Sequence, residues 1–356
     1  MSKIKFKRKV NEVRKSIKKA LTKNIRYKNQ SFQKNDAITN VNRVLICRPN
    51  HRLGNLLLIT PLLQEVSAKY PDCKIDLFVK GNIAPEIFKN YTTIDTIIQL
   101  PKKPFKQPFQ YLKSWLKIRR TKYDLTINAD RNSSSGRLST QYSNSRFKFF
   151  GDTLNVSIAS FFCDFEHVAK TAVYDFRFVI SSETIFDWNE KVPNLDLKLD
   201  ASELSHGQRI LQKIAPVDKK IISLFTYATG DKCHCTAWWE GFYENLCLSF
   251  PDHTIIEILP VENVSQIGFK AASFYSRDIR EIAAVIANTS IFIGADSGIM
   301  HLASAAKVPV VGLFSVTNPK KYRPYNNNSV AIDTTENDIE NIIEVLDTLL
   351  RHRLYY

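Results

Sequence analysis

The chain has 356 residues, of which 44% are hydrophobic and 24% are charged, with 11 glycines and 14 prolines. This composition is typical of a globular protein and excludes a disordered, collagen-like or fibrous one. Because a single core stops growing at about 250 to 300 residues, the length predicts two domains. No apolar run approaches the roughly 20 residues of a membrane span, and the charged amino terminus is unlike a secretory signal. Six cysteines are few for this length and indicate reduced thiols, so we expect a cytoplasmic protein.

The net charge of +15 is concentrated at the amino terminus. Residues 1–34 contain 13 Lys and Arg and one acid, whereas the rest of the chain has 37 against 34. We assign residues 1–36 to a basic tail whose apolar residues recur at helical spacing, namely Phe6, Val10, Val13, Ile17 and Leu21. The pattern fits an amphipathic helix on the anionic inner face of the cytoplasmic membrane, or a solvated arm. Nucleic-acid binding is the least favoured interpretation, because the body shows no recognition motif.

Strand and helix patterns alternate from residue 41 onward. Apolar runs predict strands at 44–47, 75–79, 96–100, 124–128 and 146–149, and helical stretches are expected at 55–70 and 108–120. Pro61 has no N–H to donate to the carbonyl of Leu57, so it should kink the first helix. The alternation predicts a parallel sheet with helices on both faces.

A polar segment with Pro193, residues 189–200, interrupts the pattern, and a second alternating series follows it. Strands are predicted at 221–225, 254–259, 291–294 and 308–314, and helices at 240–250, 278–288, 298–306 and 337–353. We therefore expect two doubly wound α/β domains with a linker and a C-terminal helical segment that could pack back across that linker. The boundaries are 37–190 for the first domain, 191–216 for the linker, 217–335 for the second domain and 336–356 for the C-terminal segment.

The clearest motif lies where the predicted strand 291–294 passes into the next helix through Asp296, Ser297 and Gly298. The first N–H groups of such a helix lack partners and its amino end is positive, so the turn is suited to bind a diphosphate. Ser297 and His301 are four residues apart and face the same way. The alternative is that Asp296 or Ser297 only caps the helix and that His301 is a core imidazole. The position favours a ligand site, because ligands of open α/β sheets bind beyond the carboxyl ends of the strands.

Two further loops follow strand ends. In residues 226–239, Lys232 could reach a leaving diphosphate, and Trp238 and Trp239 are candidates for core anchors. Cys233-His234-Cys235 lacks the second ligand pair of a zinc site, so no metal is expected. In residues 48–55, His51 and Arg52 are polar groups placed for a second substrate, although Asn55 could simply cap a solvated turn.

Two segments carry a family resemblance. The first is Arg52-Leu-Gly-Asn-Leu-Leu-Leu-Ile-Thr-Pro-Leu-Leu-Gln-Glu65, and the second is Asp296-Ser-Gly-Ile-Met-His301 with the downstream Pro-Val-Val-Gly-Leu-Phe-Ser-Val-Thr317. In order and spacing, over residues 42–325, they resemble glycosyltransferase family 9, the heptosyltransferases of lipopolysaccharide assembly. The resemblance implies a GT-B fold, with an acceptor-binding first domain, a donor-binding second domain, and an inverting transfer from a nucleotide sugar without a metal or other cofactor.

The resemblance also implies the donor-site residues. Lys232 would hold the leaving phosphates, and the backbone of Ser297, Gly298 and Ile299 would donate hydrogen bonds to them. The same pocket would be lined by Thr229, Asp296 and His301, with Glu262 at the ribose hydroxyls. The chain contains no Asp-x-Asp triplet, which fits a mechanism in which an ammonium and helix N–H groups replace a divalent ion.

One departure from the family pattern concerns the general base. Asn55 stands where the family has an Asp after the Gly, and an amide cannot accept the acceptor's proton. Our hypothesis is that Asp130, at the end of strand 124–128, serves as the base, with His51 in reserve. Arg52, Gly54 and Arg131 are assigned to the acceptor side.

The leading interpretation is a glycosyltransferase that moves a sugar from ADP-heptose or another nucleotide sugar to a lipid-linked glycan or lipopolysaccharide acceptor. The basic and aromatic stretch 102–120 could contact headgroups or an anionic acceptor, or be a solvated helix face. The alternative that Asn55 keeps open is a catalytically inactive homologue that binds the nucleotide sugar. A nucleotide-sugar epimerase would share the architecture but needs acid and base groups facing the donor sugar.

Overall fold

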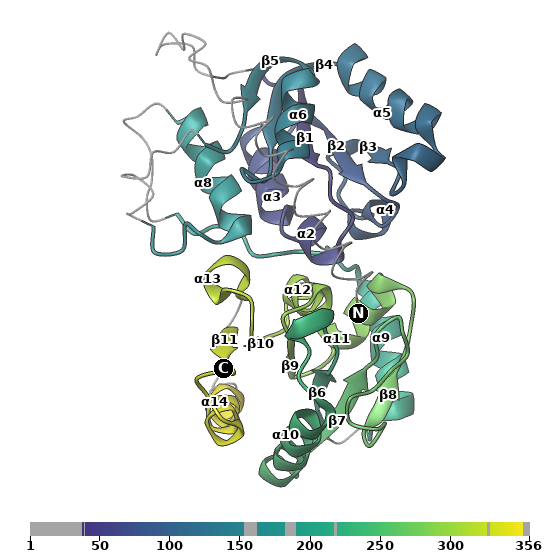
Figure 1. Cartoon of the computed structure of the whole chain (residues 1–356), viewed down its shortest axis with the longest axis vertical. Helices are drawn as coiled ribbons and strands as arrows, with labels where there is room; N and C mark the ends of the chain where they lie inside the picture. The colour runs from purple at the N-terminus through teal and green to yellow at the C-terminus, as the bar shows by residue number, and fades with distance from the viewer. Residues whose placement is uncertain are drawn as a thin grey trace, which may run out of the picture.

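The computed structural model describes residues 38, 40–152, 162–181, 190–216, 219–325 and 328–351. The basic tail predicted at residues 1–36 and the last residues of the expected C-terminal helix lie outside this range. Figure 1 shows two halves, one above the other, that meet at a narrow waist.

In the described part of the first half, five parallel strands form a sheet in the order β3-β2-β1-β4-β5. The elements are β1 (Arg43–Arg48), α2 (Leu53–Leu57), α3 (Thr60–Lys69), β2 (Lys74–Lys80), α4 (Ala84–Ile87), β3 (Ile94–Leu100), a 3-10 turn η1 (Pro104–Lys106), α5 (Pro108–Arg120), β4 (Lys122–Asn128), α6 (Ser134–Tyr142), β5 (Asn144–Phe149) and α8 (Val168–Ile180). The central strand β1 is a run of buried apolar residues from Val44 to Cys47, because helices cover both faces of the sheet.

Pro61 divides the helix that the sequence predicts at 55–70. The chain forms a short α2, turns at Leu58 and Ile59, and starts again as α3 with Pro61 in its first turn. The predicted kink is therefore a complete break. Proline fits the first turn of α3, where no N–H is required, and it therefore allows α2 and α3 to form as two separate helices.

The second half has the same architecture, with strands in the order β11-β10-β9-β6-β7-β8 in the described residues. Its elements are α9 (Ala201–Ile214), β6 (Lys220–Phe225), the 3-10 turn η2 (Gly230–Lys232), α10 (Thr236–Ser249), β7 (His253–Ile258), β8 (Ala272–Phe274), α11 (Ile279–Ala287), β9 (Ile291–Ala295), α12 (Gly298–Ala305), β10 (Val310–Phe314), α13 (Pro319–Tyr322), β11 (Val330–Asp333) and α14 (Ile339–Arg351). The expected fold of two doubly wound α/β units is confirmed.

The linker expected at 191–216 is extended only as far as Asp200. Residues 201–214 form α9, which the prediction missed. Asp200 caps this helix in a capping box with Glu203, and α9 packs on α11 of the second half, where the amide of Asn288 donates to the carbonyl of Leu204 at 3.0 Å. By its contacts, α9 is therefore part of the second half.

The extended segment 190–200 is hydrogen-bonded to both halves. The Tyr91 hydroxyl of the first half donates to the carbonyl of Asp196 at 2.6 Å, and the Leu197 N–H donates to the carbonyl of Ala305 in α12 at 3.0 Å. Direct bonds also join the halves. Arg280 of α11 donates to the carbonyl of Glu86 at 3.1 Å, and His167 Nε2 lies 2.9 Å from the carbonyl oxygen of Arg323.

The last helix, α14, packs on α10 and not across the linker. Ile342, Leu346 and Leu350 are buried in one cluster with Trp239 and Phe242 of α10. The cluster covers the outer face of the second sheet, so the expectation that α14 could return to the linker is wrong. Within the described residues, no helix combines the length and the apolar character required to cross a membrane.

Candidate active site

The carboxyl ends of both sheets face the waist, and α2 and α12 approach each other closely there, because each has a glycine at the contact. A Cβ atom on Gly54 would lie 2.7 Å from His301 Cδ2 and 3.4 Å from the Cα of Gly298. A Cβ on Gly298 would lie 3.2 Å from Leu53 Cβ. The two glycines that the sequence singled out therefore allow the two halves to touch, in addition to any role toward a ligand.

The turn predicted at 296–299 has the expected geometry. β9 ends at Ala295, the Ser297 hydroxyl caps α12 by accepting from the Met300 N–H at 3.2 Å, and α12 begins at Gly298. Ser297, Gly298 and Ile299 are half-buried, whereas Asp296 is buried. The amino end of α12, with its positive dipole and unpaired first N–H groups, is therefore directed to the waist.

Lys232 is directed into this site. Its ammonium forms an ion pair with the Asp296 carboxylate, and its side chain is 38% exposed while that of Asp296 is 7% exposed. An ammonium has three N–H donors, so the contact with Asp296 leaves others for a ligand. Asp296 thus orients Lys232 beside the α12 terminus, and two sources of positive charge lie together.

His301 lies one turn into α12 and is buried beneath this pair. Burial lowers the pKa of its imidazole to about 4, the nearby Asp296 carboxylate opposes the shift, and the Lys232 charge adds to it. The ring is therefore neutral at pH 7, and it packs against Gly54 without a charge.

A cavity of about 520 Å³ opens between the two halves. Its wall includes Asp130, Arg131 and Asn132 from the loop after β4, and Asn318, Lys321 and Tyr322 from the α13 region. Burial raises the pKa of Tyr322, and the negative charges of Asp130 and Asp296 act in the same direction, with Asp130 the stronger. Tyr322 therefore interacts electrostatically with acidic groups of both halves.

Asp130 is held in this wall by Arg48, which is the last residue of β1 and is buried. The guanidinium donates to the Asp130 carboxylate, to the side-chain oxygen of Asn55 at 3.0 Å and to the Asn55 carbonyl at 3.3 Å. The second carboxylate oxygen accepts from the Asn132 N–H at 2.9 Å. The structure thus brings Asn55 and Asp130 together through a residue that sequence reasoning missed.

Not all predicted residues converge. His51 and Arg52 are exposed at the rim, outside the cavity wall that contains Asp130, although Arg131 lines it. Burial and the cations Lys80 and Lys102 lower the pKa of His51. Thr229 and Glu262 are exposed on loops of the second half, and no contact joins either to the Lys232–Asp296 pair.

The neighbouring loops are held by side chains that pack or bond within the second half. Trp239 is a fully buried anchor, as one of the two tryptophans was expected to be, and His234 stacks on Trp238 with ring centroids 4.1 Å apart. The buried Glu257 of β7 accepts from the Thr226 hydroxyl at 2.6 Å, and burial raises the pKa of its carboxyl. Among the described residues, no group of three or more His, Cys, Asp or Glu is arranged to hold a metal ion.

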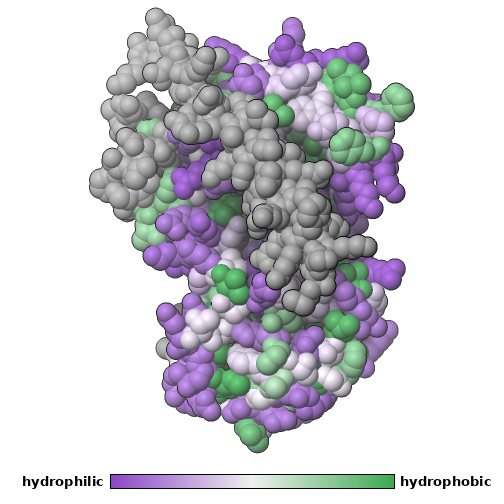
Figure 2. Space-filling model, viewed as in Figure 1, coloured by the Kyte–Doolittle hydropathy of each residue, from purple (hydrophilic) through white to green (hydrophobic). Residues whose placement is uncertain are grey.

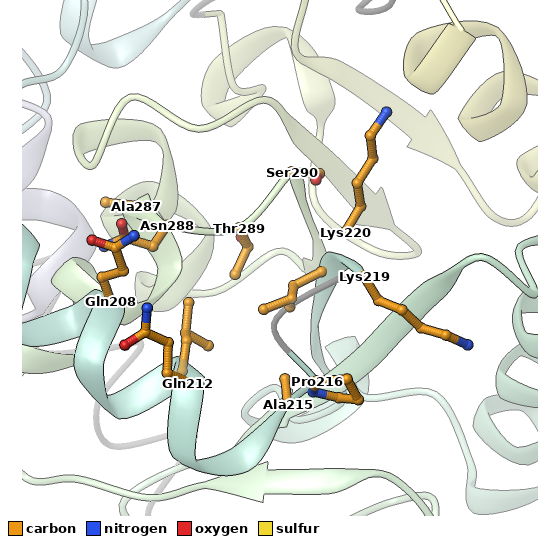
Figure 3. A pocket seen from close by; sticks show the side chains of 12 residues that line it. Gln208, Gln212, Ala215, Pro216, Lys219, Lys220, Ala287, Asn288, Thr289 and Ser290 are labelled. Atoms are coloured by element: carbon orange, nitrogen blue, oxygen red, sulfur yellow. The ribbon is translucent and has the colours of Figure 1, made fainter.

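A second cavity, of about 420 Å³, lies at the opposite, amino-terminal edge of the second sheet (Figure 3). Residues of α9, residues at the start of β6 and residues just before β9 line it, among them Gln208, Gln212, Lys219, Lys220 and Thr289. None of the predicted site residues is in its wall, so it is separate from the candidate active site.

Two Rossmann-like halves with their sheet edges turned to a shared cavity define a GT-B protein. Solved structures with this fold are similar. A glycosyltransferase family 9 protein from Veillonella parvula matches with a TM-score of 0.68 and 15% identity, over 87% of this chain and 97% of that one. The ADP-heptose lipopolysaccharide heptosyltransferase II of Escherichia coli matches with a TM-score of 0.60 and 14% identity, over 87% and 99%. An E. coli heptosyltransferase solved with ADP matches with a TM-score of 0.60 and 15% identity, over the same shares.

Sequence comparison finds similar proteins of the same kind. The family model of glycosyltransferase family 9 (heptosyltransferase) matches residues 276–344, which include β9, α12 and α13. Lipopolysaccharide heptosyltransferase 3 of E. coli is 25% identical over 295 residues, which cover 78% of this chain and 85% of that protein. The chain is a glycosyltransferase, and it is similar to glycosyltransferase family 9, which includes the lipopolysaccharide heptosyltransferases.

Proposed function

We propose that this glycosyltransferase acts by inversion and without a metal, moving a sugar from a nucleoside-diphosphate donor to a lipid-linked glycan or lipopolysaccharide acceptor in the cytoplasm. The observation that carries the proposal is the position of Asp130. Its carboxylate faces the cavity shared by the two halves, and Arg48 and the Asn132 N–H hold it there.

In the proposed reaction, Asp130 accepts the proton of the acceptor hydroxyl as that oxygen attacks the anomeric carbon of the donor. The bond between this carbon and the diphosphate breaks as the new glycosidic bond forms on the opposite face, and the nucleoside diphosphate leaves. A single displacement of this kind inverts the anomeric centre. Arg48 positions Asp130, because its guanidinium donates a charge-assisted hydrogen bond to the carboxylate.

On the donor side, Lys232 and the amino end of α12 are proposed to stabilise the negative charge that builds up on the leaving diphosphate. Preorganised N–H donors and an ammonium supply the charge that a divalent ion supplies in other transferases, which supports a metal-independent step. Structurally similar proteins have been solved with ADP and with ADP-2-deoxy-2-fluoro heptose, and we therefore propose ADP-heptose as the first donor to test. Thr229 and Glu262 are assigned to the donor loops.

The inactive-homologue alternative arose from Asn55, and the position of Asp130 argues against it. The Asn55 side chain accepts from the same Arg48 guanidinium that holds Asp130. A carboxylate is therefore available close to the position where the family has its Asp, with only Arg48 between the two side chains. A protein that only binds the nucleotide sugar has no need of this buried ionic arrangement.

The test compares Asp130→Asn with the wild-type protein in a transfer assay that contains ADP-heptose and a lipopolysaccharide core acceptor. The substitution keeps the shape and removes the proton acceptor, so kcat should fall by about 10² to 10⁴ while the Kd for ADP stays unchanged. Asn132→Ala is a control on the same loop and should lose far less activity. Full activity of Asp130→Asn would overturn the assignment of the base, and failure of the wild-type protein to transfer from any nucleotide sugar would overturn the proposed function.

A further inference from the structure

Helix α5 covers the first sheet with one face only. The Ser114 hydroxyl donates to the carbonyl of Gln99 in β3 at 2.9 Å, the Trp115 ring lies 5.3 Å from that of Phe78 in β2, and Ile118 is fully buried. Residues 114, 115 and 118 therefore mark the face that packs on the sheet. A residue half a turn away from them points outward.

The outward face of α5 is also apolar. Phe109, Leu112 and Leu116 follow one another at helical spacing, with Phe109 on the side opposite to Ile118 and Leu116 half-buried. Phe109 is 86% exposed and Leu112 is 56% exposed, and Phe105 in the preceding turn η1 is 99% exposed. Large apolar side chains exposed together mark an interaction site, because solvation of such a patch is unfavourable. A helix that only shields the sheet needs no second apolar face.

The patch is surrounded by positive charge. Residues 101–120 contain no acid and seven cations, Lys102, Lys103, Lys106, Lys113, Lys117, Arg119 and Arg120. In Figure 2, hydrophobic side chains stand among hydrophilic ones on the upper right of the molecule, where Figure 1 draws α5. Apolar side chains flanked by Lys and Arg on one helix face are the pattern of a helix that lies in a lipid headgroup layer.

We propose that η1 and the outward face of α5 dock on an anionic lipid bilayer, with Phe105 and Phe109 inserted between headgroups and the flanking Lys and Arg on lipid phosphates. Charge complementarity selects this occupant. The chain's own tail, residues 1–34, carries 13 Lys and Arg against one acid and would be repelled by the same surface. An acidic soluble partner would form ion pairs with the Lys and Arg side chains. It would not provide an apolar environment for the exposed side chains of Phe105 and Phe109.

The position of this patch has a consequence that rests on the proposed function. In a β-α-β unit the helix begins at the carboxyl edge of the sheet, and η1 follows β3 at that edge. A Cβ on Gly81 would meet Lys102 Cε at 2.9 Å and His51 Cβ at 3.2 Å, so the start of the patch is next to the predicted acceptor loop. Docking would thus bring the acceptor edge to the membrane surface, where a lipid-linked acceptor is held.

The test uses the full chain and vesicles of phosphatidylglycerol or of phosphatidylcholine whose acyl chains carry bromine, which quenches tryptophan fluorescence at short range. Phe109→Trp reports on the patch, and Leu248→Trp, at an 80% exposed position on α10 of the second half, is the matched control. With phosphatidylglycerol, Phe109→Trp should be quenched beyond the wild-type level and Leu248→Trp should not. Equal quenching of both, or none at 109, would overturn the proposal, even if the basic tail keeps the chain on the vesicle.

A second measurement separates lipid from other polyanions. Lys106→Gln with Lys113→Gln should weaken partitioning onto phosphatidylglycerol vesicles by about fivefold for each cation removed, with no change on phosphatidylcholine. Phe105→Ser with Phe109→Ser should weaken it by about tenfold or more. These variants leave transfer to a water-soluble acceptor unchanged, which distinguishes failure of docking from failure of the proposed function. Loss of binding to single-stranded RNA in the Phe variants, with vesicle binding intact, would instead assign the patch to nucleic acid.

Discussion

The two candidate sites at the waist are built in different ways. The proposed donor site is local in sequence: β9 ends, Ser297 caps α12, and the backbone itself supplies the positive helix end. The proposed acceptor site is assembled from three separate elements, with Arg48 from β1, Asn55 from α2 and Asp130 from the loop after β4. A site formed by the backbone can be predicted from one sequence motif. A site formed by side chains that are distant in the sequence can be predicted only when the fold is known.

On the proposed donor side, the largest effect is expected from the one side chain on which that site depends. Lys232→Met removes the ammonium beside α12, and kcat should fall by about 10² to 10³ because the leaving diphosphate loses its cation. Transfer kinetics measure it, and Lys69→Met, an exposed lysine of α3, is the control. A loss below tenfold would indicate that the helix end alone carries the donor phosphates.

The apposition of the halves can be broken at a single glycine. Gly54→Ala places a methyl group 2.7 Å from His301 Cδ2, so α2 and α12 must separate, at a cost of about 1 to 3 kcal/mol in the free energy of unfolding. Transfer should fall about tenfold or more because Asp130 moves away from the donor side. Gly241→Ala in α10 is the matched control, since its Cβ would meet only Ile339 Cδ1 at 3.7 Å, an ordinary contact. Chemical denaturation of both variants decides whether the glycine is needed for packing.

The tie between α9 and α11 gives a dependence of stability on pH. The hydrogen bond from Arg280 lowers the pKa of Glu203 to about 2. The folded pKa is below the usual value of about 4.3, so this contribution to stability is present above pH 4.3 and is lost as the pH falls toward 2. Glu203→Gln should therefore be less stable at neutral pH and less sensitive to acid over this window. Urea unfolding at pH 7, 4 and 3 tests it, with the exposed Glu340→Gln as the control that should follow the wild-type curve.

The smallest effect is expected from substitution of His51, and it tests the proposal that Asp130 is the general base. His51 lies at the rim outside the Asp130 wall, so His51→Ala should change kcat by less than about threefold and leave the pH profile of kcat in place. A loss of a hundredfold in His51→Ala, together with near-normal activity of Asp130→Asn, would transfer the role of base to the imidazole.

Periodic and locally capped elements were predictable from the sequence. Helix α5 has the predicted bounds 108–120, and the turn at 296–299 lies at the end of its strand as expected, because apolar spacing and cap residues fix such elements locally. The capping box of Asp200 and Glu203 marks the start of α9 in the sequence. The prediction missed this helix because it continued the polar linker around Pro193 through the helical residues. The short edge strands β8 and β11 have too few apolar residues to stand out.

The assembled acceptor side could be predicted only in part. Asp130 was placed in the cavity from its position after a strand, but its partner Arg48 is 82 residues away. The two meet because β1 and β4 are neighbours, with Cys47 opposite Asn128. That pairing depends on strand order, which alternation of strands and helices does not specify. The available signal in the sequence was an arginine directly after the apolar run from Val44 to Cys47.

The extended segment 190–200 restricts how the halves can swing apart. Its hydrogen bonds to Tyr91 and to Ala305 attach it to opposite sides of the waist. A rotation of the two halves that preserves these two bonds must therefore have its axis at this segment. The direct hydrogen bonds between the halves, such as those of Arg280 to Glu86 and of His167 to Arg323, must break in such a rotation. His167 lies at the start of α8 and Arg323 at the end of α13, so the contact between these two helices would have to open for the halves to separate.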